Sequence, residues 1–533
     1  MNIIAEIMSM AKELRASNAE KEVEKRTKSV RGIVIYRGIK MQGCVRELLR
    51  VSKMLVSMAS EKEAERFLLS WVKSTPFRGK VFIVGGYPRD ELLGLDAKDL
   101  DIVVEMKGGA AKLTAWIHHM FPNETTNPHQ LGAGYPIWQI TFKEDIEYDG
   151  DQFATSGAVI EFADTQKEMF PDPDSRQRVV EYGTLNEDIE RRDFTVNMLL
   201  KDLTTGEILD LTGTSVKDLK DGVLRGHPGV DFDKILRDDP LRMMRCIRFQ
   251  AKYGWNIPMY VLKAIRRNAS RINIVSAERI CGELVKIMEI GKLAQAIKLM
   301  KAVGLLQYVF PEIQAMKGVE HEYSRGKHQE GSVLRHTLLV LQNAKPGVDN
   351  QLAALLHDVG KPESQEVIDG LIRFIGHDKV GGEIAEGIMR RLKFDSATVM
   401  RVRKIVENHM RPHTLTRNES VGPSALRRFI REVGDELVGA VLDLAEADEL
   451  GNHPVQNLVP DLRKDIEALR VHVEKAEKLP VDGLDIQRIL GIKPGKQVGE
   501  ALKYLSDKKF DIEQVGGEMT EKDAEKLLRE KFT

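Results

Sequence analysis

Near residue 225 the hydrophobic period of this sequence changes from that of strands to that of helices, and this change constrains the fold more than any other feature. Between about residues 76 and 225 the apolar segments are short and rich in β-branched residues, as in KVFIVGG, LDIVVEM, PIWQITF, GAVIEFA and GEILDLTG. Gly, Pro and Asp separate them, which is typical of β-strands. From residue 231 onward the apolar residues recur at helical spacing, as in LRMMRCIRFQAKYGW. We therefore predict an α+β fold in which a mixed-sheet head precedes a long all-α part.

The chain of 533 residues is long enough to bury several cores. Residues 1–75 have the pattern of charged helical segments, and we find no chemistry in them. The remaining parts that we predict are a head at 76–225, a helical neck and body at 226–315, a further α-helical domain at 316–460 and a helical tail at 461–533. Inside the head, the polar stretch IEYDGDQFATS predicts a flexible loop.

Composition excludes several classes of protein. The 80 Lys and Arg residues nearly cancel the 81 Asp and Glu residues, so any nucleic-acid surface has to be a local patch. The cysteines Cys44, Cys246 and Cys281 lie far apart without a CxxC pair, which argues against disulfides and favours a reducing compartment. No uncharged run reaches about eighteen residues. We therefore expect a cytoplasmic protein without a membrane partner, and the sequence leaves its oligomeric state open.

Acidic residues interrupt two of the predicted strands. Residues two apart in a strand point to the same face, so we predict that Asp99 and Asp101 of LDIVVEM and the preceding residues project together while Leu100 and Ile102 enter the core. Carboxylates held side by side repel, and divalent cations relieve that repulsion in two-metal phosphoryl and nucleotidyl transfer. Glu161, an acid inside the apolar segment VIEFA, is a natural third ligand. The alternatives are a solvated turn for the aspartates and a water-facing edge strand for Glu161.

A second pattern of charges follows in DDPLRMMRCIRF. Asp239 and Arg242 are three residues apart, and Arg245 and Arg248 continue the row, so we predict one helical face that alternates an acid with guanidinium groups. Arg and Asp together can read the Watson–Crick edge of a base, because their donors and acceptors have fixed geometry. The alternative is a salt-bridged surface helix.

These segments together resemble the class II nucleotidyltransferases, the family of bacterial-type CCA-adding tRNA nucleotidyltransferases and poly(A) polymerases. The head motif of that family is matched by GGYPRDELLGLDAKDLD, with Pro88 where a small apolar residue is more usual. The segments RRDFTVN, DLKDGVLRG, ILRDDPLRMMRCIRF and VSAERICGELVKIM follow in the family's order. The resemblance covers about residues 81 to 290.

The resemblance implies a two-metal reaction with Mg²⁺, in which an RNA 3′-hydroxyl attacks the α-phosphate of CTP or ATP. Asp99, Asp101 and Glu161 would be its catalytic residues and metal ligands. The implied nucleotide-binding residues are Gly85, Gly86, Arg89, Arg191, Arg192, Asp193, Asn197, Asp238, Asp239, Arg242 and Arg245. The leading specificity is CCA addition to tRNA, and poly(A) addition is the alternative because the same residue types serve both.

A second set of ligand-type residues lies in VLRHTLLVL, LAALLHDVGK, FIGHDKV, VRKIVENHM and LDLAEADELGN. Imidazole with carboxylate suits a transition metal such as Ni²⁺ or Mn²⁺, which can activate water for phosphoester hydrolysis. The pattern resembles the HD-domain phosphohydrolases, and the implied metal ligands are His336, His357, Asp358, His377, His409 and Asp448. We take His321, His328 and His413, which lie outside the pattern, as surface residues.

Other interpretations stay open. In one alternative, phosphoester hydrolysis at the HD site is the main activity and the head is only an RNA-docking module. In another, the metal of the HD site serves only to stabilise the structure. A non-enzymatic RNA-binding protein is disfavoured, because both sets of acidic and histidine residues are intact. In the tail, GIKPGKQVG would place Lys493 and Lys496 near an RNA phosphate, with a simple capped helix turn as an equal alternative.

Overall fold

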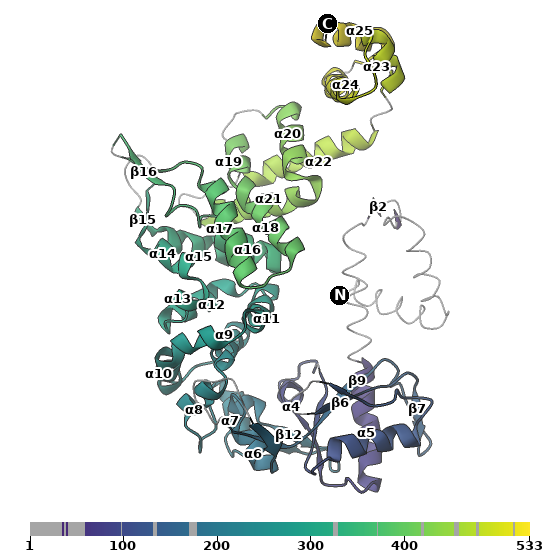
Figure 1. The fold of residues 1–533 in the computed structure, drawn as a ribbon, viewed down its shortest axis with the longest axis vertical. Helices are drawn as coiled ribbons and strands as arrows, with labels where there is room; N and C mark the ends of the chain where they lie inside the picture. The colour runs from purple at the N-terminus through teal and green to yellow at the C-terminus, as the bar shows by residue number, and fades with distance from the viewer. Residues whose placement is uncertain are drawn as a thin grey trace. The chain divides into compact units, whose positions relative to one another are not determined.

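The structure is a computed structural model, drawn in Figure 1. It describes residues 35–36, 39–40, 59–97, 99–131, 136–169, 179–322, 329–369, 371–416, 421–451, 458–475, 479–514 and 517–532. The chain forms two compact units: one ends at Arg242 and adds Trp255–Ala264, and the other combines Met243–Gly254 with the chain from Ile265 onward. The predicted domain boundaries stay predictions. The predicted α+β class is confirmed.

The first unit is built on a seven-stranded mixed sheet. All neighbouring strands are antiparallel except β4 and β9, which are parallel. The five strands predicted from the sequence are all present. In sheet order the strands are β13 (Ile208–Leu209), β12 (Leu200–Asp202), β3 (Val81–Val84), β4 (Asp101–Val104), β9 (Val159–Asp164), β6 (Ile137–Thr141) and β5 (His129–Leu131).

Both faces of the central strands are buried, which explains why their sequences are apolar at almost every position. On one face, residues such as Ile83 and Ile102 share a core with α5 (Gly109–Met120). On the other face, Phe82 and Val103 pack with residues of α6 (Leu185–Glu190). The sheet is therefore a rigid base for the side chains at its strand ends.

Residues 59–71 form a helix that belongs to the core of the head. Phe67 is fully buried and its ring contacts those of Trp71, Phe142 and Phe153. The last part of the predicted N-terminal extension is thus an integral part of the head. The other described elements of that extension are two short strands, β1 (Ile35–Tyr36) and β2 (Ile39–Lys40), and the 3-10 helix η1 (Val72–Ser74).

The stretch predicted as a flexible loop is instead a β-hairpin of β7 (Ile146–Tyr148) and β8 (Asp151–Phe153). Its turn is formed by Asp149 and Gly150, with φ values of 55° and 81°. An Asp-Gly pair with positive φ at both positions forms the tight turn that hairpins favour. Ile146 and Phe153 are buried, so the hairpin is anchored in the core. A second pair joins β10 (Gln166–Met169) to β11 (Val179–Tyr182).

The remainder is mainly helical, as predicted. The helices around the junction of the two units are α7 (Ser215–Asp221), α8 (Phe232–Asp238), α9 (Leu241–Tyr253) and α10 (Met259–Asn268). The second unit continues with α11 (Ala277–Glu289), α12 (Leu293–Ala302), α13 (Leu306–Val309), α14 (Pro311–Ala315), α15 (Val333–Asn343), α16 (Val348–Leu356), α17 (His377–Arg391), α18 (Ser396–Asn408), α19 (Met410–Thr416), α20 (Pro423–Val433), α21 (Asp435–Gly451) and α22 (Val459–Lys475). Short hairpins interrupt it at β14 (Glu320–Glu322) with β15 (Gln329–Ser332), and at β16 (Gln365–Ile368) with β17 (Leu371–Phe374).

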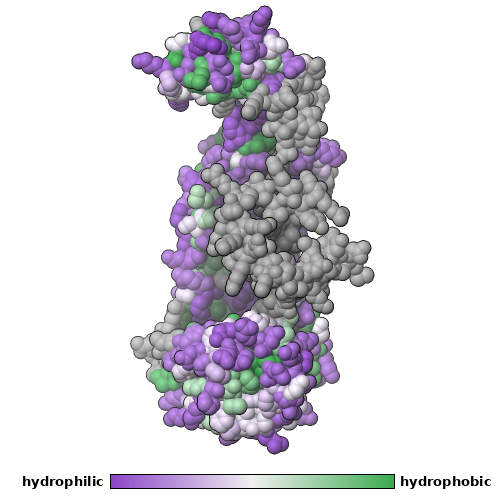
Figure 2. Space-filling model, turned by 90° about the vertical axis from the view of Figure 1, so that its right-hand side faces the viewer, coloured by the Kyte–Doolittle hydropathy of each residue, from purple (hydrophilic) through white to green (hydrophobic). Residues whose placement is uncertain are grey.

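The tail residues pack around a small core of their own, formed by α23 (Gly483–Leu490), α24 (Lys496–Gln514) and α25 (Glu521–Phe532). Lys493 and Lys496 are exposed, and their contact with an RNA phosphate stays a prediction. No helix in the described part of the chain combines the length and the apolar character that a membrane span requires. The face of the head visible in Figure 2 is mainly hydrophilic, with small hydrophobic spots.

Candidate active site and metal centre

Three acidic residues meet at one end of the central strands. Asp101 lies directly opposite Glu161 in the parallel pair of β4 and β9, and Asp99 lies two residues earlier with a φ of 61°. Strand β4 begins at Asp101, so the prediction that Asp99 lies within the strand is wrong, although Leu100 and Ile102 are buried as expected. The interior position of β9, between β4 and β6, excludes the edge-strand interpretation of Glu161.

Burial and the crowding of these carboxylates raise the pKa of Asp101. Its pKa is raised to about 6, first because protein atoms displace water from the carboxylate and then because the charges of Glu161 and Asp99 repel it. The residue as a whole remains exposed, so the crowded carboxylate can still be reached from solvent. Gln139 donates a hydrogen bond from Nε2 to Oε1 of Glu161 at 3.2 Å. These carboxylates are oxygen ligands of the kind that Mg²⁺ prefers, and a divalent cation would relieve their repulsion.

Two glycines bring the backbone close to these groups. Gly85, with φ 80° and ψ −127°, has a conformation that other residues rarely adopt. A Cβ atom on Gly85 would lie 3.5 Å from Oδ2 of Asp101, so the backbone lies against the carboxylate. Gly86 begins α4 (Gly86–Leu92), where a Cβ atom would lie 3.2 Å from a guanidinium nitrogen of Arg89.

Arg89 is buried and links α4 to the RRDFTVN segment. Its guanidinium donates to Oδ1 of Asn197 at 2.6 Å and forms an ion pair with Asp90 at 2.7 Å. Asn197 in turn donates to Oδ1 of Asp193 at 3.0 Å. The structure thus brings three of the predicted nucleotide-binding residues into one buried network. Their contact with a nucleotide stays a prediction.

Arg191 and Arg192 share one buried partner. Each contacts a different oxygen of Asp188 at 2.7 Å. Burial alone would raise the pKa of Asp188, but the charges of Arg192 and Arg191 lower it below its ordinary value. The charge of Arg192 also acts on Asp101 and lowers its pKa, against the larger causes that raise it. The network therefore contributes positive charge that favours the ionised form of Asp101.

The predicted base-reading residues do not share one helical face. Asp239 lies in an extended break between α8 and α9, with a φ of −142°, because the helix does not continue through Pro240. Arg242 is buried and donates to the carbonyl oxygens of Ile235 at 2.7 Å and Arg191 at 2.5 Å. Its pKa is lowered by burial, with Asp239 acting in the opposite direction. Arg242 therefore ties this break to the RRDFTVN segment.

Two further predicted nucleotide-binding residues have local contacts. Asp238 forms an ion pair with Lys234 at 3.0 Å, one turn earlier on α8. Arg245 lies over the ring of Phe249 at 5.7 Å, one turn later on α9. A role of either residue in base selection stays a prediction.

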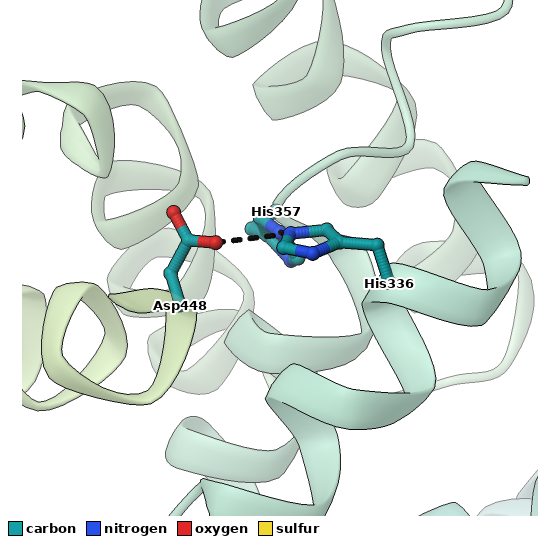
Figure 3. Close-up of side chains that lie close together, drawn as sticks. All are labelled: His336, His357 and Asp448. Atoms are coloured by element: carbon teal, nitrogen blue, oxygen red, sulfur yellow. Dashed lines mark hydrogen bonds and ion pairs between the residues drawn. The ribbon is translucent and has the colours of Figure 1, made fainter. Parts of the chain in front are cut away.

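In the second unit, the predicted metal ligands converge from five helical segments and all six are buried. His336 on α15 and Asp448 on α21 point toward one another, with 2.9 Å between Nε2 and Oδ1 (Figure 3). His357 completes this group, and the three ligand atoms lie within 4.8 Å of one another.

A second group adjoins the first. Asp358, His377 and His409 also offer ligand atoms within 4.8 Å of one another. Oδ1 of Asp358 lies 3.5 Å from Nε2 of His377, and Oδ2 lies 3.2 Å from Nε2 of His357 in the first group. Lys361 contacts the same Oδ2 at 2.7 Å. The cluster therefore offers two adjacent sets of three ligand atoms. Asp358 belongs to the second set and also contacts His357 of the first.

The rings of this cluster are oriented by the backbone. Nδ1 of His357, His377 and His409 lies 2.9, 2.8 and 2.7 Å from the carbonyl oxygens of Ala354, Phe374 and Val406. A carbonyl can only accept, so Nδ1 carries the proton and Nε2 keeps a lone pair for a metal ion. Burial is the largest cause that lowers the pKa of His409, to about 3, which keeps its ring neutral. This donor set fits a divalent transition metal.

For one histidine near the cluster, His413, the prediction of a surface position is wrong. His413 on α19 is not a surface residue: its side chain is 14% exposed, and Nε2 lies 2.9 Å from Oδ2 of Asp448. The signal that could have found it is its spacing, since it follows His409 by one helical turn. The side chain of His321 and the whole of His328 lie outside the described residues.

Three domain families match the chain in succession. Residues 81–225 match the poly A polymerase head domain, and residues 255–317 match a probable RNA and SrmB-binding site of polymerase A. Residues 333–452 match the HD domain.

The sequence matches to curated relatives cover most of this chain and most of each relative. A CC-adding tRNA nucleotidyltransferase of Thermus thermophilus is 32% identical over 339 residues, covering 61% of this chain and 73% of the relative. The chain belongs to the tRNA nucleotidyltransferase family. An A-adding tRNA nucleotidyltransferase of Deinococcus radiodurans is 29% identical over 458 residues, covering 81% of this chain and 92% of the relative. A multifunctional CCA protein of Neisseria gonorrhoeae is 30% identical over 320 residues, covering 59% and 70%.

Solved structures agree with this nucleotidyltransferase in fold. A CCA-adding enzyme in apo form has a TM-score of 0.57 at 20% identity, covering 88% of this chain and 94% of that one. The Bacillus stearothermophilus CCA-adding enzyme in complex with CTP has a TM-score of 0.54 at 21% identity, covering 83% and 91%. The Thermotoga maritima CCA-adding enzyme complexed with tRNA also has a TM-score of 0.54. It is 19% identical, and the match covers 92% of this chain and 96% of that one.

The head of this nucleotidyltransferase also contains a buried network that the sequence did not suggest. Tyr87, beside the glycine pair, donates to Glu65 on the N-terminal helix at 2.6 Å. Lys201 forms ion pairs with Glu65 at 2.6 Å and with Glu91 at 2.8 Å. Burial, and then the hydrogen bond to Glu65, raises the pKa of Tyr87, so the phenol stays protonated. The helix at 59–71 therefore fixes α4, which carries Arg89.

The raised pKa of Asp101 predicts a pH dependence of Mg²⁺ binding to this nucleotidyltransferase. Protons compete with the cation for this carboxylate, so the apparent dissociation constant of Mg²⁺ should be flat above about pH 7 and rise about tenfold per pH unit below about pH 6. The measurement is Mg²⁺ activation of nucleotide addition between pH 5 and 8. A dependence that begins only near pH 4, the ordinary value for Asp, would contradict this prediction.

Proposed function

We propose that this nucleotidyltransferase completes the 3′ end of tRNA by adding C, C and A from CTP and ATP. The observation that carries the proposal is the group of Asp99, Asp101 and Glu161 at one end of the central strands, with the backbone of Gly85 against it. The names of the relatives, which refer to CC, A and CCA addition, support the choice of substrate. We place the reaction in the cytoplasm, where reduced thiols such as the buried Cys246 and Cys281 persist.

The three carboxylates would hold Mg²⁺, which when bound supplies positive charge to the reacting phosphate and favours ionisation of the RNA 3′-hydroxyl. In the reaction the 3′-oxygen forms a bond to the α-phosphorus of the nucleotide as the bond to the β-phosphate oxygen breaks, and pyrophosphate leaves. Gly85 leaves room for the triphosphate beside the carboxylates. Arg192, whose charge reaches Asp101, offsets negative charge on the leaving group.

For base selection we propose the break between α8 and α9. Asp239 there is adjacent to Pro240 and outside either helix, and Arg242 anchors the break to the carbonyl of Arg191. A rigid acid of this kind can accept from the amino group that C and A both carry. Asp238, the last residue of α8 and the neighbour of Asp239 in the chain, would adjust its surroundings. The same arrangement serves poly(A) addition, so the choice between them is a matter for experiment.

The test uses purified protein, Mg²⁺ and a tRNA that lacks its terminal CCA, with labelled CTP and ATP supplied singly and together. We expect two C residues with CTP alone and a complete CCA end with both nucleotides. Two C residues even with both nucleotides, or A added only to a tRNA ending in CC, would limit the enzyme to one part of the reaction. A long A tail would make it a poly(A) polymerase, and no incorporation in any combination would overturn the proposal.

A second function is favoured by a separate observation, the buried cluster of six ligand-type residues in the HD domain. We propose that it holds Ni²⁺ or Mn²⁺ and hydrolyses a phosphoester. The orientation of Nε2 on His357, His377 and His409 toward the centre supports metal binding, because the backbone fixes each ring. Metal retained only for structure is the alternative, and it predicts metal without phosphatase activity.

A further inference from the structure

Asp448 uses its two carboxylate oxygens in different directions. Oδ1 lies 2.9 Å from Nε2 of His336, inside the metal centre. In Figure 3 the other oxygen points away from His336. That oxygen, Oδ2, lies 2.9 Å from Nε2 of His413, a residue outside the six predicted ligands. His413 thus contacts a candidate metal ligand on the side remote from His336.

We propose that His413 is a positioning residue of the metal centre, which holds Oδ2 of Asp448 so that Oδ1 stays directed at the metal. This inference rests on the proposed metal binding by the HD domain. In metal sites, a ligating carboxylate is itself hydrogen-bonded, and loss of such a partner costs affinity although no ligand is removed.

The position of His413 suits this role. It lies on α19, which directly follows His409, so one short segment carries both a candidate ligand and the residue that orients another. The two histidines are four residues apart, a spacing that places side chains on one side of a helix.

The imidazole is also constrained from its other side. Nδ1 of His413 lies 3.9 Å from Oε1 of Glu449, the residue after Asp448 on α21. Oε2 of Glu449 accepts hydrogen bonds from the backbone nitrogens of Leu458 at 2.9 Å and Val459 at 3.3 Å. The ring therefore lies between two consecutive carboxylates, and the second of these is fixed by the start of α22. A side chain held in this way loses little entropy when a metal binds.

The test measures Ni²⁺ binding to the metal-stripped full chain, with excess Mg²⁺ present to occupy the carboxylates of the head. His413→Leu, which is similar in size but has no donor, should bind Ni²⁺ about 10- to 100-fold more weakly than the wild type. His413→Gln, which keeps a donor, should recover most of that loss. Thr414→Ala, on the exposed side of the same helix, is the matched control and should bind as the wild type does.

Melting curves of the metal-free proteins separate this role from a merely structural one. We expect the metal-free His413→Leu protein to melt close to the wild type and to lose most of the rise in melting temperature that Ni²⁺ causes. If His413→Leu does not fold, His413→Ala and His413→Gln carry the same comparison. Tight Ni²⁺ binding by the donor-free variants would overturn the role of His413 alone. Failure of the wild type to bind Ni²⁺ would overturn the metal centre itself and this inference with it.

Discussion

Replacing Asp101 with alanine should lower kcat/KM for nucleotide addition by about a thousandfold or more, which is about 4 kcal/mol of transition-state stabilisation. Asp101 lies beside Glu161 in the sheet and near Asp99, so its removal leaves a cation with two of three carboxylates. The stability of the folded head should not decrease. The raised pKa of Asp101 shows that its charge is unfavourable in the folded head, so the alanine variant should melt at or above the wild-type temperature near pH 7.

The matched control is Asp96→Ala, which removes an exposed carboxylate from the loop before Asp99. It should keep kcat/KM within about twofold, since an exposed side chain in a loop contributes little. Steady-state rates with CTP and a truncated tRNA measure both variants. Activity of Asp101→Ala within tenfold of the wild type would remove Asp101 from the catalytic metal site.

The second large effect is expected at Asp358 in the HD domain. Burial would raise its pKa, but the charges of His357 and Lys361 hold the pKa well below the ordinary value, so the residue is a buried anion. Asp358→Asn keeps the shape and removes the charge. Breaking a buried ion pair in this way typically costs roughly 3 to 5 kcal/mol, because Lys361 is left with its charge in the interior. We expect a lower midpoint in urea unfolding, together with loss of bound metal and of any phosphatase activity.

Asp369→Asn is the control for this experiment. Asp369 is exposed and has a φ of 52°, a conformation that asparagine also tolerates, so stability should change by no more than about 0.5 kcal/mol. An Asp358→Asn protein as stable as the wild type would mean that the buried pair with Lys361 contributes little. Retention of tightly bound metal by that variant would exclude Asp358 as a ligand.

Much of the head could be predicted because its signals are local. Short β-branched runs gave the five strands, and the carboxylates of Asp99, Asp101 and Glu161 stood out against apolar surroundings. Their meeting depends on the parallel pairing of β4 with β9, a contact between segments about sixty residues apart that no local pattern encodes. The sequence therefore marked Glu161 as a natural third ligand without the pairing that brings it beside Asp101. The hairpin at Ile146–Phe153 was missed because its polar residues outweighed an Asp-Gly turn signal that was present.

Side chains that act through other side chains were the hardest to predict. Glu65 lies in a segment with the pattern of a solvated charged helix, yet it is buried against Tyr87 and Lys201. Arg242 was predicted to face a base, which stays a prediction, and its hydrogen bonds to two backbone carbonyls were not predicted. The spacing of His413 from His409 could have marked it, but that spacing does not identify Asp448 as its contact. In each case at least one partner lies more than twenty residues away in the sequence, so only the folded structure identifies it.

The most direct test of the central claim is to locate Mn²⁺ by anomalous scattering in crystals of the full chain grown with CTP and Mn²⁺ in place of Mg²⁺. We predict a peak within bonding distance of the carboxylates of Asp99 and Asp101, with Glu161 and the nucleotide phosphates beside it. A nucleotide bound elsewhere, or a metal that contacts none of these three residues in protein that still extends tRNA, would contradict the account.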